Sequence, residues 1–159
     1  METAVEILQF VAITAMALTA GGQIFCTRSL IQALPAYSTE VSVQVHQESM
    51  TWRPDSYLKR VATLGTAVPF VIVVLIVIDG DVDVVPMVLT LVAGLLGAFQ
   101  GYVTVHYEWP INNEVNSWGS GPVPDRYAEM RKEWDDKHVV RTVASTLALA
   151  CLTAAAILY

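Results

Sequence analysis

A histidine and an arginine near the end of the chain are its clearest candidates for catalytic residues. Trp134, His138 and Arg141 follow one another at helical spacing, so in a helix they share one face. Imidazole titrates near neutral pH, so His138 can act as a general base. Arg141 is a fixed cation that can hold an anionic oxygen, and the amides of Asn112 and Asn113 can donate hydrogen bonds to it. We therefore predict that His138, Arg141, Asn112 and Asn113 are catalytic residues.

The three histidines of the chain suggest a second kind of chemistry. Imidazole is a common ligand for Cu and Fe, and His46, His106 and His138 all lie in or beside polar segments. A carboxylate such as Glu48 or Glu108 could complete the ligand set. No compact His-x-x-x-His or Glu-x-x-His motif is present, so the alternative is three unrelated histidines. We predict a possible Cu or Fe site formed by His46, His106, His138 and Glu48; without it no cofactor is expected.

The composition predicts a membrane protein. Hydrophobic residues make up 54% of the 159 residues and charged residues only 15%, whereas a soluble domain has about a quarter of its residues charged. Basic residues are mixed with acidic ones and the net charge is −6, which argues against a nucleic-acid partner. Four apolar segments are long enough to cross a hydrocarbon core of roughly 30 Å. We predict one all-α domain over residues 1–159, a four-helix transmembrane bundle with spans at about 4–34, 57–78, 84–107 and 138–158.

The distribution of charge predicts how this bundle lies in the membrane. All nine lysine and arginine residues lie in the two longer connections, 36–56 and 108–137, or at the adjoining helix ends. The termini and the short 79–85 turn, at the opposite side, carry acidic residues only. By the positive-inside rule, both long connections form a polar cap in the cytoplasm and both termini are extracytoplasmic.

Several side chains inside the predicted spans could face a ligand or a neighbouring helix. Thr19, Gln23 and Thr27 recur every four residues, which favours either an interhelical hydrogen-bonding seam or a polar pocket lined by Gln23. Trp134 and Trp109 could form apolar walls for a flat ligand. We predict Trp134, Trp109, Gln23 and Tyr107 as substrate-binding residues.

Proline, glycine and tryptophan suggest local structure between the spans. Gly94, Gly97 and Gly101 form a smooth stripe that allows close helix packing and leaves room for a homo-oligomer contact. Pro110 is predicted to end the third helix. The 36–56 connection is either a short interfacial helix or an extended re-entrant segment, and Trp52 beside Arg53 suits an anchor at the membrane interface.

Two of these segments resemble a known family. The sequence PINN at 110–113 ends the third span, and RYAEMRKEWDDKHVVRT at 126–142 opens the fourth. Together they resemble the Pro-x-Asn-Asn and Trp-x-x-x-His-x-x-Arg-Thr motifs of the anthrone-oxygenase-like family of small four-span membrane proteins. The run Ala20-Gly21-Gly22 also resembles the glycine-rich first span of that family.

The resemblance implies a membrane oxidoreductase, a monooxygenase that converts the methylene of a polycyclic, phenol-like substrate into a quinone carbonyl with dioxygen. Its chemistry could run through a His-bound redox metal, or through deprotonation of the substrate by His138 while Arg141 holds the enolate oxygen. The expected partners are a small hydrophobic substrate and the lipid bilayer. A non-catalytic alternative stays open, in which Arg141 pairs with Glu108, Glu114 or Asp135 as a clasp and the protein binds a lipophilic ligand or a partner subunit.

Overall fold

Helices account for nearly all of the structure. The computed structural model describes residues 2–49, 57–80 and 82–159, and no strand occurs among them. Two π-helical segments, η1 and η3, continue their preceding helices without a break. The elements in chain order are α1 (Glu2–Phe25), η1 (Cys26–Leu30), α2 (Ile31–Ala33), the 3-10 turn η2 (Leu34–Ala36), α3 (Thr39–Ser49), α4 (Tyr57–Asp79), α5 (Val84–Val103), η3 (Thr104–Glu108), α6 (Trp109–Ser117) and α7 (Tyr127–Leu158).

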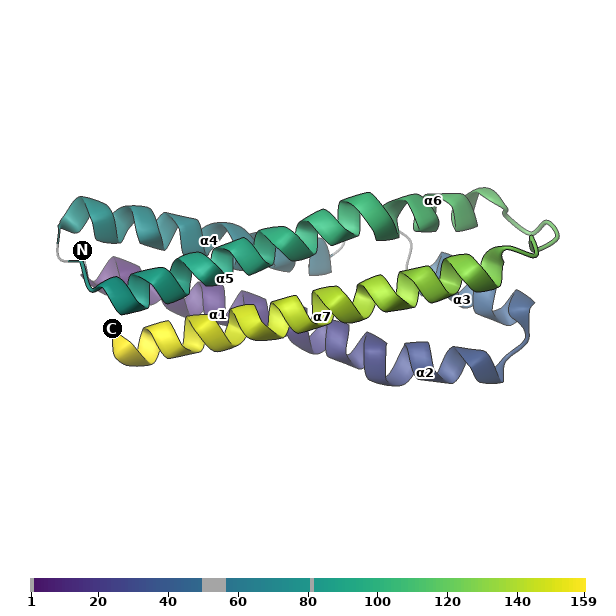
Figure 1. Ribbon diagram of the computed structural model, residues 1–159, viewed down its shortest axis with the longest axis horizontal. Coiled ribbons are helices and arrows are strands. Elements are labelled where there is room, and N and C mark those ends of the chain that lie inside the picture. The colour runs from purple at the N-terminus through teal and green to yellow at the C-terminus, as the bar shows by residue number, and fades with distance from the viewer. Residues whose placement is uncertain (1, 50–56, 81) are drawn as a thin grey trace.

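Four helical segments of the described chain are long and apolar enough to cross a membrane, which confirms the predicted all-α four-span bundle. They are Glu2–Ala36, Tyr57–Asp79, Val84–Ser117 and Tyr127–Leu158. At 1.5 Å per residue, α7 with its 32 residues is about 48 Å long, well beyond a hydrocarbon core of roughly 30 Å. α7 is therefore longer than the apolar layer is thick, and α3 and α6 lie at the end of the bundle opposite to the two termini (Figure 1).

The four spanning helices form a closed ring around an apolar core. α1 packs against α4 and α7, and α5 packs against α4 and α7. This core consists of buried side chains from all four helices: Val5, Ala12, Met16, Val68, Ile72, Ile76, Ala93, Ala148 and Leu152. Large apolar side chains such as Phe10, Val77 and Ile157 are exposed on the outside. This outer apolar surface is what a helix bundle presents to lipid tails.

Glycines of α5 allow α4 to approach closely. A Cβ placed on Gly97 would lie 2.8 Å from the hydroxyl oxygen of Thr66, and one on Gly94 would lie 3.0 Å from the ring of Phe70. Two of the three predicted stripe positions therefore pack within the chain. A Cβ on Gly101 would have no atom within 4 Å. Of the three stripe positions, Gly101 alone therefore has room for a contact with a second copy of the chain, and that contact stays a prediction.

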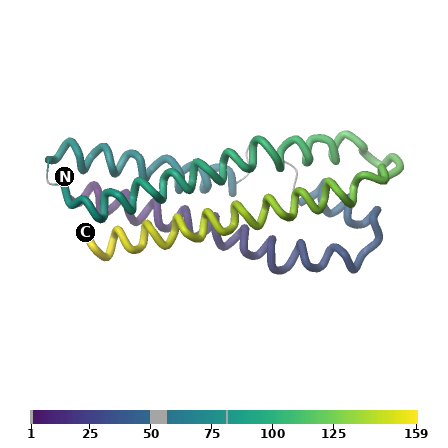
Figure 2. The backbone as a smooth tube through the Cα atoms, viewed as in Figure 1, coloured from purple at the N-terminus to yellow at the C-terminus, as the bar shows by residue number. Residues whose placement is uncertain are grey.

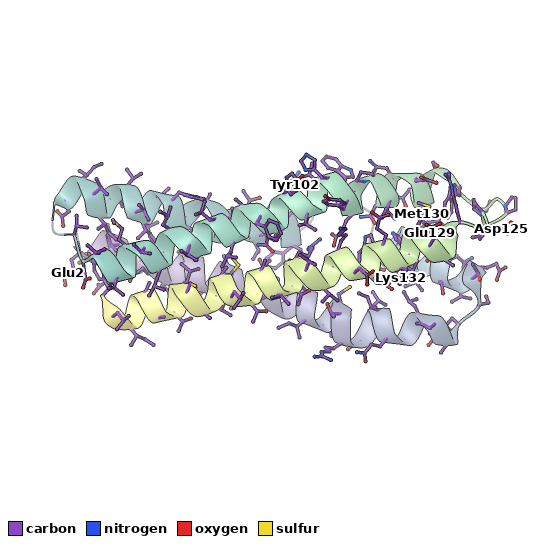
Figure 3. All side chains as sticks on the ribbon, in the orientation of Figure 1. Glu2, Tyr102, Asp125, Glu129, Met130 and Lys132 are labelled. Atoms are coloured by element: carbon purple, nitrogen blue, oxygen red, sulfur yellow. The ribbon has the colours of Figure 1, made fainter. Side chains whose placement is uncertain are left out.

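The termini and the connection between α4 and α5 lie at one end of the molecule, and α3, α6 and the first turns of α7 lie at the other (Figures 1 and 2). Figure 3 shows Glu2 at the first of these ends and Asp125 at the second. We call the second end the polar end. It has its own small core, formed by Val43, Ile111, Val115, Tyr127 and Trp134.

The 36–56 connection contains a short helix, α3, rather than an extended segment. Gln47 of α3 donates to the backbone oxygen of Val115 in α6 at 2.9 Å, and Ser42 donates to the backbone oxygen of Leu34 at 3.2 Å. These bonds hold α3 against the polar end. The predicted anchor of Trp52 and Arg53 lies outside the described residues.

The prediction that Pro110 ends the third helix is wrong. Pro110 lies in the first turn of α6, and the helix continues to Ser117. The π-helical segment η3 precedes it, and the N–H of Trp109 donates to the oxygen of Thr104, five residues back. Proline is tolerated here because the usual bonding pattern is already interrupted, and the first turn of a helix needs no N–H donor.

Candidate functional site

The π-helical turn in the third span brings one carboxylate into the bundle. Buried residues along α5 follow one another in steps of four residues or fewer from Thr90 to Val103. The next buried residue, Glu108, comes after a step of five. A π turn inserts one extra residue, which matches this step and keeps the same face of the helix turned inward. Glu108 is only 1% exposed as a result.

Glu108 bridges two residues of α7. Its Oε2 forms an ion pair with Nη1 of Arg141, and its Oε1 lies 3.3 Å from Nδ1 of His138. The contact with His138 is too poorly aligned for a full hydrogen bond, but such contacts often tighten only when a substrate is bound. A carboxylate in a low-dielectric interior needs a cation beside it, and Arg141 supplies that cation.

Polar side chains from three helices form the inner boundary of this group. The amide of Gln23 in α1 lies 2.9 Å from that of Gln100 in α5 and 2.7 Å from the hydroxyl of Ser145 in α7. When the amide oxygen of Gln23 faces Arg141, it also accepts from Nη2 of Arg141 at 3.2 Å. In that orientation Arg141 contacts both Glu108 and Gln23. These contacts are those of an interhelical seam.

Nearer the start of α7 than Arg141, two side-chain rings of this helix stack on each other. The rings of Trp134 and His138 are nearly parallel, at 14°, with their centroids 4.7 Å apart. Trp134 is 2% exposed and His138 is 4% exposed. Neither Nε1 of Trp134 nor Nε2 of His138 has a hydrogen-bond partner. A neutral imidazole with its proton on Nδ1 presents a lone pair at Nε2, which is the form that a general base requires.

A second polar group lies further out and joins α3 to α6 and α7. Nη1 of Arg131 lies 3.3 Å from Nδ1 of His46, and Nε2 of His46 lies 2.9 Å from Oδ1 of Asn112. Arginine can only donate, so Nδ1 of His46 is the acceptor and Nε2–H donates to Asn112. Arg131 is also paired with Asp135 at 2.8 Å. Burial lowers the pKa of His46 to about 4, although the hydrogen bond with Asn112 opposes this shift.

The comparison with protein families agrees with this arrangement. A family model described as anthrone oxygenase matches residues 54–151, well over half of the chain. This chain belongs to the anthrone oxygenase family. The match confirms the resemblance seen in the sequence and, together with the four apolar helices, supports a membrane protein of oxygenase type. No curated protein and no solved structure gives a significant match.

The region matched to the anthrone oxygenase family contains the His138–Arg141 pair and its carboxylate partner Glu108. It begins after α3, so Gln23 and His46 lie outside it. The contacts of the site therefore extend from the matched region to the first helix and to α3.

The predicted catalytic and substrate-binding residues are only partly brought together. His138, Arg141 and Trp134 are adjacent in the buried interior, whereas Asn112 contacts His46 and Asn113 is exposed. Two of the predicted substrate-binding residues are half-buried. Tyr107 lies under the ammonium group of Lys137, 4.3 Å from its ring centroid, and Trp109 opens α6.

The predicted metal ligands are spread over the polar end. His106 is exposed and stacks on Tyr102 with ring centroids 4.1 Å apart, whereas His138 is buried. Figure 3 shows Tyr102 on the outside of the bundle. Glu48 is also exposed, and both ring nitrogens of His46 are engaged. No group of three or more His, Cys, Asp or Glu side chains in the described chain is arranged to hold a metal. The residues present do not fit the predicted four-ligand site, and Cu or Fe elsewhere stays an untested prediction.

Two important residues were not among the predicted site residues. Glu108 was considered only as one of several partners or ligands, because a straight helix gives no signal for the step of five that buries it. Arg131 had a visible signal: it precedes Trp134 by three residues and His138 by seven, so it shares their face. That signal was masked by the many charged residues around it.

Proposed function

We propose that this protein is a membrane monooxygenase that oxidises a small, polycyclic, phenol-like substrate with dioxygen, using His138 as the base. The observation that carries the proposal is the buried group Glu108–His138. A carboxylate oxygen lies 3.3 Å from one ring nitrogen of the imidazole, and the opposite nitrogen is buried without a partner. This is the arrangement by which an acidic residue prepares a histidine to accept a proton.

The proposed reaction converts a methylene and dioxygen into a carbonyl and water. His138 Nε2 removes a proton from the activated methylene, and the resulting enolate gives electrons to dioxygen to form a carbon–oxygen bond. The protonated imidazole then returns its proton to the peroxide. Loss of the second methylene hydrogen as a proton breaks the oxygen–oxygen bond and releases water. The substrate supplies all four electrons, so no external reductant is consumed.

Arg141 takes a different role in this proposal from the one that the sequence suggested. Its guanidinium is paired with Glu108, so it positions that carboxylate rather than holding the enolate oxygen. A cation inside a membrane protein needs such a partner. Arg141 therefore acts as the structural clasp that pairs with Glu108, whereas His138 keeps a ring nitrogen without a partner and can serve as the base.

The membrane position of the site suits a hydrophobic substrate. At about 1.5 Å per residue, His138 lies roughly 30 Å from the C-terminal end of α7, near the boundary of the apolar layer. An open apolar groove on the outside of the bundle, between α5 and α7, is lined by Leu96, Phe99, Val139, Val140, Val143, Ala144 and Leu147. We propose that the substrate enters from the bilayer or the cytoplasm, with the polar end in the cytoplasm.

The test is anthrone oxidation by protein purified in detergent, with oxygen uptake and product measured together. We expect one dioxygen consumed per carbonyl formed, and a loss of about 100-fold or more in His138→Gln. His106→Gln separates the two mechanisms, because the base mechanism leaves its activity unchanged and the three-histidine metal site predicts a comparable loss. Anthrone binding without any oxidation by the wild type would favour the non-catalytic alternative.

A further inference from the structure

Buried hydrogen-bonding atoms without partners gather on one face of α7. Nη2 of Arg131, Nε1 of Trp134 and Nε2 of His138 all lack a partner, and the three side chains are between 2% and 9% exposed. The spacing of three and four residues places them in one row along the helix. Because leaving a buried polar atom unpaired costs about 1–3 kcal/mol, such atoms are rare in native proteins and several together point to a bound molecule.

The three side chains form one continuous stack. The guanidinium carbon of Arg131 lies 4.8 Å from the ring centroid of Trp134, and the Trp134 ring stacks in turn on His138. The other nitrogens of Arg131 are occupied, since Nη1 contacts His46 and Nε contacts Asp135. The guanidinium that carries Nη2 is therefore fixed beside the Trp134 ring, and the hydroxyl of Tyr127 is a further neighbour of Arg131.

The chemistry of these atoms specifies what they can bind. The Nε1–H group of Trp134 and the Nη2 group of Arg131 can only donate, whereas Nε2 of His138 can accept. A ligand that satisfies all three has an oxygen acceptor facing Trp134 and Arg131 and an acidic proton facing His138. A developing anthrone enolate has both features, with the oxygen and the carbon that loses the proton on opposite sides of the central ring.

We propose that Trp134 Nε1–H and Arg131 Nη2 form the donor pair that holds the substrate oxygen as it becomes negatively charged. This inference rests on the proposed function and assigns to these two residues the role that the sequence suggested for Arg141. Trp134 then acts through its N–H group as well as through its apolar ring. Both groups are buried, so the oxygen must enter the interior of the polar end to reach them.

The test uses 2-hydroxyanthraquinone, a flat phenol that cannot undergo the oxidation and changes colour when it ionises. Its binding and its pKa are measured by absorbance with detergent-purified wild type, Trp134→Phe and Trp118→Phe. The phenylalanine variant keeps an aromatic ring at 134 but removes the N–H. Trp118 also lies in the core of the polar end and packs on Tyr127, so its variant controls for the general effect of the change.

We expect the wild type to bind the phenolate and to lower the pKa of the bound dye. Trp134→Phe should weaken phenolate binding about tenfold and raise the bound pKa by about one unit, in line with the loss of a hydrogen bond to a charged group. Trp118→Phe should change neither value, and unsubstituted anthraquinone should bind all three proteins equally. Arg131→Lys, which keeps the charge but removes Nη2, should also raise the bound pKa if Trp134→Phe fails to fold.

Two results would overturn the inference: no saturable dye binding by the wild type, or equal affinity and equal bound pKa in the wild type and Trp134→Phe. The outcome is distinct from that of the proposed function. A pKa shift that depends on Trp134 in a protein without oxidase activity supports the donor pair and removes the proposed reaction. Oxidation that depends on His138, with no effect of Trp134→Phe on the dye, supports the proposed reaction and overturns the donor pair.

Discussion

The carboxylate of Glu108 lies 3.3 Å from the imidazole of His138 and binds Arg141 through its second oxygen. Glu108 comes from the third spanning segment and the other two from the fourth, so this contact joins two helices inside the bundle. One ring nitrogen of His138 lies beside this carboxylate, and the other is buried without a hydrogen-bond partner. The predictions below test this pair and the elements that hold it.

Removing the charge of Glu108 should destabilise the bundle by leaving the half-buried cation of Arg141 without a carboxylate partner. We expect Glu108→Gln to lower the free energy of unfolding in detergent by about 3–5 kcal/mol, the usual cost of breaking a buried ion pair. The double variant Glu108→Gln with Arg141→Met should recover much of this loss, because the unpaired charge is gone. Unfolding followed by circular dichroism gives the three values, and strictly additive losses would contradict the pair.

Acid should weaken the attachment of α3. The pKa of His46 falls from 6.5 to about 4 on folding, so the unfolded state takes up the proton first. The stability contributed by neutral His46 is fully present above about pH 6.5 and is lost as the pH falls from there toward 4. We expect hydrogen exchange of α3 to speed up over this window.

The control for this acid effect is a histidine that is already exposed. His46→Gln, which cannot titrate, should flatten the pH dependence of exchange in α3, while His106→Gln should leave it as in the wild type. An unchanged pH profile in His46→Gln would mean that another group causes the effect.

Close packing of α5 on α4 should make two similar glycines respond differently to alanine. At Gly97 the added Cβ would meet the hydroxyl of Thr66 at 2.8 Å, whereas at Gly101 it would meet nothing within 4 Å. We expect Gly97→Ala to destabilise the protein by about 1–3 kcal/mol through overpacking. Gly101→Ala should be neutral or slightly stabilising, because alanine favours the helix. Equal unfolding midpoints for the two variants would contradict this packing.

The polar end should face the cytoplasm. All basic residues of the chain belong to the two long connections or their helix ends, so the positive-inside rule directs that end inward. A reporter that is active only in the cytoplasm should be silent when fused to the C-terminus and active when inserted at Gly119, in the turn between α6 and α7. The opposite pattern would reverse the proposed topology.

The spanning helices were predictable because length and apolar composition determine them almost alone. The row of Trp134, His138 and Arg141 was also predictable, since helical spacing places these residues on one face. The π turn before Pro110 was not, because proline usually ends a helix and only the packing of Glu108 against α7 reveals the inserted residue. The position of His106 was missed for a related reason: it lies near His138 in depth but on the outside of its helix.

Mixing the protein with anthrone in the absence of oxygen tests the central claim most directly, because it isolates proton removal from the later steps. The wild type should produce the absorbance of the bound enolate, which should decay to the carbonyl product when oxygen is admitted. His138→Gln, with its fold checked by circular dichroism, should produce no enolate. Equal enolate formation in both proteins would contradict the assignment of His138 as the base.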